Sequence, residues 1–203
     1  MLTENKRSDP RLFEFCRLIT TDSLSLQERV SAALKEFPLS TKAAGVTLCL
    51  SHKKRMAINQ RYNTQAYEKA PQGCVWIKAN KKQRTTLNPP QDFWCYAGQV
   101  LLVSTPRSRE QLYNGQFVTV VSVSAHLVRV RGQGSAKLVT LSHALAGSLL
   151  RPSHSITYAS CQGCTFANQI VRLLDVRHHC FTARHLLVGL SRASSASLVE
   201  CGL

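Results

Sequence analysis

Apolar and polar positions are spaced in different ways along the chain, and each spacing predicts a different kind of element. In the first forty residues, apolar side chains recur three or four positions apart, as on one face of a helix. Pro10 can open a first helix, and the capping-box pair Ser25 and Glu28 opens a second one that Pro38 ends. We therefore expect residues 1–43 to form an N-terminal helical linker.

Short apolar runs bounded by polar turns appear next, and they are typical of buried parallel strands. The run 44–50 ends at Ser51, and a helix is expected over 52–62. After Pro152 the same pattern of short apolar runs returns. Strands are expected at 155–158, 170–174 and 197–201, and a helix at 183–190 that Thr182 opens. Strands that alternate with helices indicate an α/β lobe, which we assign to residues 44–92 and 151–203.

Residues 93–150 show a third pattern, in which short β-type runs follow one another about ten residues apart without helices. Turn signals at 113–116 and 131–134 separate them, and the runs are 99–103, 117–123, 127–131 and 137–141. This spacing favours a small antiparallel barrel. The predicted fold class is thus α/β: a parallel-sheet lobe interrupted by a small antiparallel β-barrel.

The net charge of the chain indicates a class of function. The 203 residues include 26 Lys and Arg against 11 acidic residues, a formal net charge of +15. Such a surplus on a small chain points to contact with polyanions, most often nucleic acid. The apolar runs are far shorter than the ~20 residues of a membrane span, and the N-terminus MLTENKRSDP has no apolar signal region. We expect an intracellular protein that is neither secreted nor membrane-spanning.

The eight cysteines are interpreted as reduced thiols, because no secretory signal accompanies them. One arrangement suggests zinc: Cys161 and Cys164 are followed by His178, His179 and Cys180. A closed zinc site needs two ligand pairs, and three adjacent residues make an awkward second pair, so we expect no zinc and no metal ligands. A zinc-binding adaptor remains an alternative. A hydrolase built on Cys180 and His178 is disfavoured, because no oxyanion-forming turn accompanies them.

Two segments near the C-terminus carry the candidate chemistry. In 155–166, SITYASCQGCTF, a strand ends at Thr157, Gly163 allows the backbone to approach a ligand, and Thr165 can cap a following helix. In 185–193, HLLVGLSRA, an apolar helix ends at Arg192. Its guanidinium is permanently charged and forked, which suits phosphate oxygens. Taken singly, an arginine there is more often a positive charge at the end of the helix dipole.

Together with 48–59, LCLSHKKRMAIN, these segments resemble the C-terminal motor half of superfamily-one DNA helicases of the Pif/RecD type. The segment 155–166 is similar to the family's motif V, Thr-x-His-Lys-x-Gln-Gly-x-Thr, and 185–193 to its motif VI, Leu-Tyr-Val-Ala-Leu-Ser-Arg. The inserted barrel, in which 112–115, LYNG, precedes a β run, also resembles the small Src-homology-3-like subdomain that the family inserts before motif V. Ala159 and Ser160 depart from the family pattern, which has His and Lys there. The resemblance covers about residues 10–203.

The resemblance implies a second RecA-like lobe of the P-loop type and a role for each matching residue. Arg192 would be a catalytic arginine finger, and ATP would be contacted by Gln162, Gly163, Ser191 and Arg192. Single-stranded DNA would be contacted by Ser51, His52, Asn59, Thr157 and Thr165. The basic segment 78–84 would add Lys78, Lys81, Lys82 and Arg84 to this DNA surface.

The sequence also lacks what a complete motor of this family requires. It contains no Gly-x-x-x-x-Gly-Lys-Ser/Thr phosphate loop, and no Asp-Glu pair follows an apolar strand to hold magnesium. We expect ATP and Mg²⁺ to bind only with a complementary first lobe, encoded upstream or on a separate chain. The chain would then be a fragment or half of a split 5′-to-3′ DNA helicase, inactive alone and located in the nucleus or wherever DNA is replicated. The alternative is a stand-alone basic nucleic-acid-binding module without ATPase activity.

Overall fold

The computed structural model describes residues 8–21, 23–80 and 91–202, which form two compact units. The first unit comprises the described residues of Met1–Arg55 and His154–Leu203, and the second comprises those of Met56–Ser153. The second unit is therefore inserted into the first along the chain. None of the described helices is long and apolar enough to cross a membrane.

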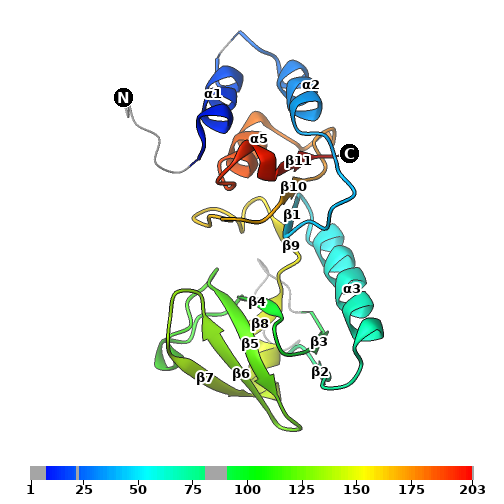
Figure 1. Ribbon diagram of the computed structural model, residues 1–203, viewed down its shortest axis with the longest axis vertical. Helices are drawn as coiled ribbons and strands as arrows, with labels where there is room; N and C mark the ends of the chain where they lie inside the picture. The colour runs from blue at the N-terminus through cyan, green and yellow to red at the C-terminus, as the bar shows by residue number, and fades with distance from the viewer. Residues whose placement is uncertain (1–7, 22, 81–90, 203) are drawn as a thin grey trace. The chain divides into compact units, whose positions relative to one another are not determined.

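A four-stranded parallel sheet forms the centre of the first unit (Figure 1). Its order is β11-β10-β1-β9, with β1 at Val46–Cys49, β9 at Ser155–Thr157, β10 at Val171–Leu173 and β11 at Val199–Cys201. Leu48 lies opposite Ile156 on one side and Leu173 on the other, and all three are fully buried. The apolar runs of the sequence thus correspond to strands covered on both faces, as the α/β interpretation predicts.

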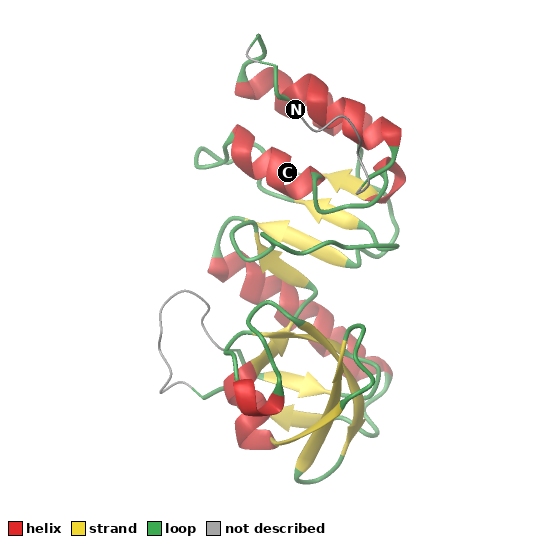
Figure 2. Ribbon diagram, turned by 90° about the vertical axis from the view of Figure 1, so that its left-hand side faces the viewer, coloured by secondary structure: helices red, strands yellow, loops and turns green. Residues whose placement is uncertain are grey.

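Helix α5 (Ala183–Leu190) lies between this sheet and the pair α1 (Pro10–Ile19) and α2 (Leu26–Glu36), as Figures 1 and 2 show. The predicted caps are present: Ser25 and Glu28 form a capping box at α2, and Thr182 caps α5. A short 3₁₀ turn, η2 (Ala196–Leu198), precedes β11.

The N-terminal helices belong to the first unit, which differs from the linker expected for residues 1–43. Leu12 and Phe37 are buried at 0% and 2% exposure, and α2 packs on α5 and β11. The Cys201 amide donates to the Phe37 carbonyl at 2.7 Å. The apolar stripes of α1 and α2 cover the sheet unit instead of spacing it from another part.

Helix α3 (His52–Lys69) begins where the sequence predicts and continues beyond the expected end at residue 62. No proline or glycine interrupts it, since the next breakers are Pro71 and Gly73. The division between the two units falls inside this helix, after Arg55, and not at residue 93 as the pattern change suggested.

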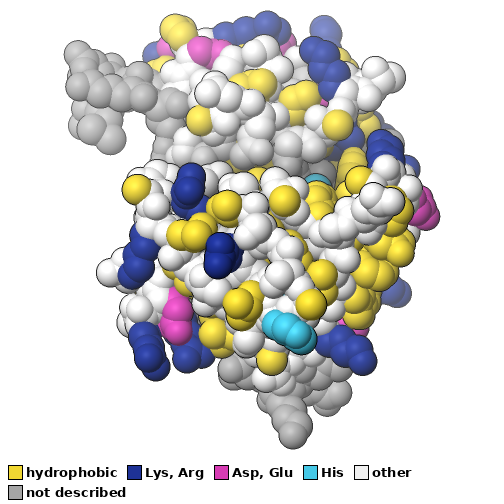
Figure 3. Space-filling model, turned by 60° about the horizontal axis from the view of Figure 1, so that its bottom comes forward, with side chains coloured by type: hydrophobic (Ala, Val, Ile, Leu, Met, Phe, Trp, Pro, Cys, Tyr) yellow, Lys and Arg dark blue, Asp and Glu magenta, His cyan; other side chains and the backbone are white. Residues whose placement is uncertain are grey.

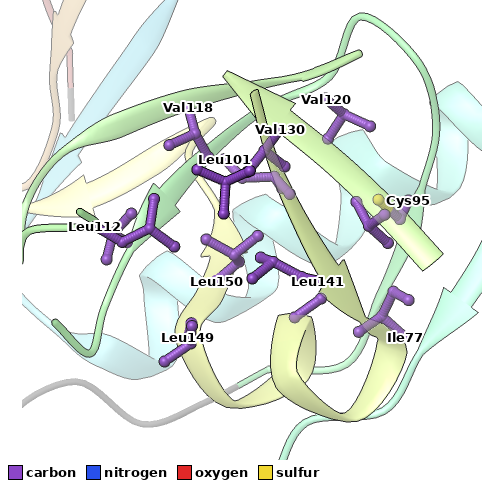
Figure 4. Close-up of a cluster of buried hydrophobic side chains, with 14 of the residues drawn as sticks. Ile77, Cys95, Leu101, Leu112, Val118, Val120, Val130, Leu141, Leu149 and Leu150 are labelled. Atoms are coloured by element: carbon purple, nitrogen blue, oxygen red, sulfur yellow. The ribbon is translucent and has the colours of Figure 1, made fainter. Parts of the chain in front are cut away.

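An antiparallel barrel dominates the second unit. Five strands run in the order β7-β6-β5-β4-β8, and β2 pairs separately with β3. Their bounds are β2 Val75–Ile77, β3 Phe93–Cys95, β4 Val100–Val103, β5 Phe117–Val123, β6 Leu127–Gly132, β7 Leu138–Ser142 and β8 Leu150–Pro152, with η1 at Ser108–Glu110 and α4 at His143–Leu149. Side chains from these elements converge on one core (Figure 4). The alternating burial of β6 and β7 matches the predicted period of two.

Several elements of the second unit, among them β3, α4 and β8, were not predicted. β3 lies next to the Pro89-Pro90 breaker, and α4 contains Gly147, a weak helix former. β8 follows α4 directly and pairs with β4, Leu102 lying opposite Arg151. Ile77 and Phe93 are both fully buried in the barrel core, which explains why residues before 93 belong to this unit.

Candidate functional site

The end of β9 and the loop that follows it hold four of the residues predicted to bind a ligand, Thr157, Gln162, Gly163 and Thr165. Thr157 is 4% exposed, and its Oγ1 lies 2.9 Å from the Ser160 Oγ and accepts a bond from the Ser160 amide at 3.2 Å. Gly163 has φ of +85°, a left-handed conformation that side chains rarely adopt. Gln162 and Gly163 are exposed on this loop.

Thr165 does not cap a helix, contrary to the prediction. Residues 158–170, all of which the structure describes, form turns and one isolated bridge. That bridge is parallel and joins Phe166 to Ala193, and the Phe166 amide donates to the Arg192 carbonyl at 2.8 Å. Pairing with the end of α5 replaces the expected helix, while Thr165 itself stays exposed.

Arg192 lies at this junction, half-buried. Its Nε donates to the Val188 carbonyl at 3.1 Å, its Nη1 to the Cys164 carbonyl at 3.1 Å and its Nη2 to the Ser191 Oγ at 2.9 Å. The Ser191 hydroxyl also donates to the Val188 carbonyl, at 3.1 Å. Because a guanidinium carries about five N–H donors, these bonds leave donors for a further acceptor.

The same contacts also fit a purely structural role for Arg192 at the end of helix α5. Val188 is four residues before Arg192, and its carbonyl belongs to the last turn of α5, so the arginine closes the helix C-terminus and complements its dipole. The sequence alone does not predict the hydrogen bond to the Cys164 carbonyl, which fixes the guanidinium against the loop of Gln162 and Gly163.

The two thiols of this loop, Cys161 and Cys164, are part of its packing. The Cys161 thiol is fully buried and donates to the Tyr158 carbonyl at 3.1 Å. Burial raises the pKa of Cys161 to about 12, although the charge of Arg192 opposes that shift. Burial also raises the pKa of the Cys164 thiol. Both sulfurs are therefore protonated near neutral pH and belong to the packing of the loop.

A pocket of about 260 Å³ separates this loop from the first turns of α5. Ala159 and Gln162 line it from the loop, Arg184 and His185 from the helix. The His185 Nδ1 accepts the Thr182 amide at 3.1 Å, and burial, followed by the charge of Arg184, lowers the pKa of His185. Neither Arg184 nor His185 was predicted. Both residues lie one helical turn before Val188 of the motif and share a helix face with it. This spacing is the sequence signal that could have identified them.

Asp175 organises the carboxyl end of β1, at the same edge of the parallel sheet as the loop that follows β9, and was also missed. Its Oδ2 accepts the Leu50 amide at 2.9 Å, and its Oδ1 pairs with the Lys54 ammonium. Ser51 Oγ accepts the Lys54 amide at 3.1 Å and so caps α3. Ser51 is exposed and His52 is half-buried at the start of the helix, so both lie at the surface that follows β1.

The remaining predicted residues lie in the second unit or outside the described residues. Asn59, predicted to contact DNA, is fully buried in this structure, and its Nδ2 donates to the Pro152 carbonyl at 3.2 Å. Lys78 is exposed directly after β2. Lys81, Lys82 and Arg84 lie outside the described residues.

No protein-family model matches the chain, and no curated protein is detectably similar to it in sequence. Solved structures are similar in fold. Pif1 from Bacteroides bound to single-stranded DNA matches with a TM-score of 0.66 and 14% identity, covering 96% of this chain and 49% of that one. The same helicase in complex with ADP-AlF3 and single-stranded DNA matches with a TM-score of 0.65 and 15% identity, covering 100% and 51%.

Pif1 helicase from Candida albicans matches with a TM-score of 0.62 and 14% identity, covering 95% of this chain and 53% of that one. This chain thus spans about half the length of the helicases that it resembles. The likeness agrees with the family resemblance of the motifs, and at this level of identity it shows the fold. The chain has the fold of one half of a Pif1 helicase, a RecA-like parallel-sheet lobe with an inserted antiparallel barrel.

Proposed function

We propose that this chain is the second motor lobe, with its inserted barrel, of an ATP-dependent DNA helicase that moves 5′ to 3′. In this proposal a complementary first lobe holds ATP and Mg²⁺, and Arg192 contacts the ATP as an arginine finger. The observation that carries the proposal is the position of Arg192. Its guanidinium is half-buried, fixed to the Cys164 carbonyl, and retains free donors next to an exposed loop.

This position suits phosphoryl transfer. Negative charge spreads over the transferred phosphoryl group, and a fixed guanidinium stabilises it without having to reorganise. Gln162, Gly163 and Ser191 would line the same side of the nucleotide. The sequence contains no phosphate loop of its own, so the chain alone would neither hydrolyse ATP nor unwind DNA. The motor function requires no zinc.

Single-stranded DNA is the proposed second partner. Ser51, His52 and Thr165 offer polar groups at or near the surface of the first unit, and Thr157, which is buried, would act by holding the loop in shape. Lys78, with Lys81, Lys82 and Arg84, would contribute phosphate contacts and release of counterions. Such a motor would work in the nucleus or wherever DNA is replicated.

A second candidate function is a stand-alone nucleic-acid-binding module. Arg129 and Arg131 alternate with buried residues on β6 and are exposed, so both point outward from the barrel. On the face in Figure 3, Lys and Arg side chains are widely spread among neutral and apolar groups. Phosphate contacts from outward-pointing arginines such as Arg129 and Arg131 would be independent of base sequence and would need no ATP.

The test measures ATP turnover and affinity for labelled oligo-dT, first with the chain alone and then with the chain fused to the first lobe of a Pif1 helicase. We expect no turnover by the chain alone, and affinity that falls steeply as salt is raised. In the fusion we expect turnover that single-stranded DNA stimulates and that Arg192→Ala removes. Arg192→Lys should restore little of it, because an ammonium lacks the fork.

Arg177→Ala is the matched control, since this exposed arginine lies in the same unit and in neither motif. It should leave turnover by the fusion intact. Robust turnover by the isolated chain would contradict the two-lobe proposal. DNA affinity of the fusion that is independent of ATP, without turnover, would favour the stand-alone module instead.

A further inference from the structure

Two imidazoles and a thiol gather on one exposed turn of the first unit, between β10 and α5. The His178 amide donates to the Asp175 carbonyl at 2.9 Å, and the Phe181 amide donates to the His178 carbonyl at 2.8 Å. Two successive tight turns therefore fold the backbone back on itself. As a result the side chains of His178, His179 and Cys180 meet, and their potential ligand atoms lie within 4.8 Å of one another.

The backbone of the turn uses one ring nitrogen of His178 and leaves the other for an ion. The Cys180 amide donates to the His178 Nδ1 at 3.1 Å, so the lone pair of Nδ1 is occupied and Nε2 is the nitrogen that would bind a metal. The rings of His178 and His179 stack with centroids 4.3 Å apart and an angle of 28°. All three side chains are exposed, so they can rotate without disturbing a core.

A pocket of about 490 Å³ adjoins this turn. His178 and His179 line one side of it, and the oxygen-bearing side chains of Gln27 and Ser31 line it from α2. Its apolar lining comes from Leu26, Val30, Val176 and Phe181. An ion held by the turn would lie at the edge of this pocket, with room for water or an external ligand in a further coordination position.

We propose that His178, His179 and Cys180 form a binding site for a transition-metal ion of the Zn²⁺ class. Two imidazole nitrogens and one thiolate would bind the ion, and the fourth position would stay open to the pocket. Imidazole and thiolate are ligands that Zn²⁺ prefers, and three protein ligands with one open position make an open zinc site. Tetrahedral geometry needs ligands about 3.5 Å apart, so the exposed side chains must close by about 1 Å.

This site differs from the closed site that the sequence argues against. The earlier expectation of no zinc considered Cys161 and Cys164 as one ligand pair, and in the structure neither is part of the group. A turn that supplies three ligands by itself needs no second pair. The site stands apart from the proposed motor function and does not rest on it.

One neighbouring charge provides a specific signature. Arg177 also lines the pocket, and its positive charge opposes a divalent ion. Removing that charge with Arg177→Gln should therefore tighten metal binding, by about threefold at low salt. An adventitious contact of a single histidine elsewhere on the surface would show no such response.

The experiment titrates the reduced full chain with Co²⁺, whose thiolate charge-transfer and ligand-field bands report the ligand set, and then displaces it with Zn²⁺. We expect one tight site. Cys180→Ser should remove the charge-transfer band, and His179→Ala should weaken binding about tenfold or more. Cys164→Ser and His126→Ala are the controls for a half-buried thiol and an exposed imidazole outside the turn, and both should bind like the wild type.

Far-UV circular dichroism checks that each variant is folded, which the exposure of the three side chains leads us to expect. A charge-transfer band that survives Cys180→Ser, or that disappears with Cys164→Ser, would overturn the assignment. Absence of saturable binding in the wild type would overturn it as well. None of these outcomes bears on ATP turnover or DNA affinity, so this proposal and the motor proposal fail separately.

Discussion

Gly147 in α4 is the position where a single added methyl group should have the most clearly calculable effect. A Cβ built there would lie 2.0 Å from the carbonyl oxygen and 3.0 Å from the carbonyl carbon of Lys78. The obstacle is backbone, so no side-chain rotation relieves it. The Asn80 amide donates to the Gly147 carbonyl at 3.2 Å, which holds the two segments together.

Two effects of opposite sign determine the outcome of Gly147→Ala. Overpacking costs about 1–3 kcal/mol, and an overlap of this size with backbone falls at the upper end. Alanine regains about 1 kcal/mol of helix propensity. The net loss is therefore about 2 kcal/mol, equivalent to a decrease of about 8–16 °C in the melting temperature of a unit of this size.

Tryptophan fluorescence measures this loss selectively, because both tryptophans, Trp76 and Trp94, lie in the second unit. Urea denaturation of Gly147→Ala followed at the tryptophan emission should show an earlier midpoint with an unchanged slope. Ala144→Leu adds bulk on the exposed face of the same helix and should stay within about 0.5 kcal/mol of wild type. Equal or greater stability of Gly147→Ala would refute the close approach of α4 to β2.

Three further outcomes are expected. Asn63→Ala should destabilise the second unit by about 2–4 kcal/mol in the same fluorescence assay, because Asn63 accepts the Trp94 amide at 2.6 Å and donates to its carbonyl at 2.7 Å. Burial lowers the pKa of His185 below 6.5, so the unfolded state binds the proton first, and stability should fall as the pH drops below 6.5; His185→Gln should reduce this slope in denaturation followed by circular dichroism. Iodoacetamide should modify the exposed Cys180 first, and mass spectrometry should find Cys161, whose pKa burial raises to about 12, protected until the chain is unfolded.

The elements that the sequence predicts well are those whose signals are local. Helix 183–190 matches its predicted bounds, because the Thr182 cap directly precedes it and the apolar stripe lies within it. The β runs of the barrel follow from alternation alone. By contrast, α4 and β8 form from a stretch whose glycine weakens the helix signal, and packing on β2 and β4 stabilises them. Where local propensity is weak, tertiary contacts determine which element forms.

The candidate site divides in the same way. The motif predicts that Ser191 and Arg192 end a helix, and they do. Asn59 was predicted to contact DNA from the motif resemblance, but it is fully buried and donates to a carbonyl 93 residues away in the chain. Asp175 was missed because its partners, Leu50 and Lys54, are more than a hundred positions distant. Burial and pairing across such separations leave no trace in a local pattern.

The order of strands in the parallel sheet has a consequence for how the protein is made. β1 emerges from the ribosome early, yet both of its neighbours, β9 and β10, are translated only after residue 154. The intervening barrel is continuous in sequence and rich in neighbouring antiparallel pairs, so it can complete its core during synthesis. The parallel sheet, in contrast, cannot form until about the last fifty residues have been translated. During that interval the apolar strand at 46–49 has no partner, and it is the segment that a nascent chain most needs to shield from aggregation.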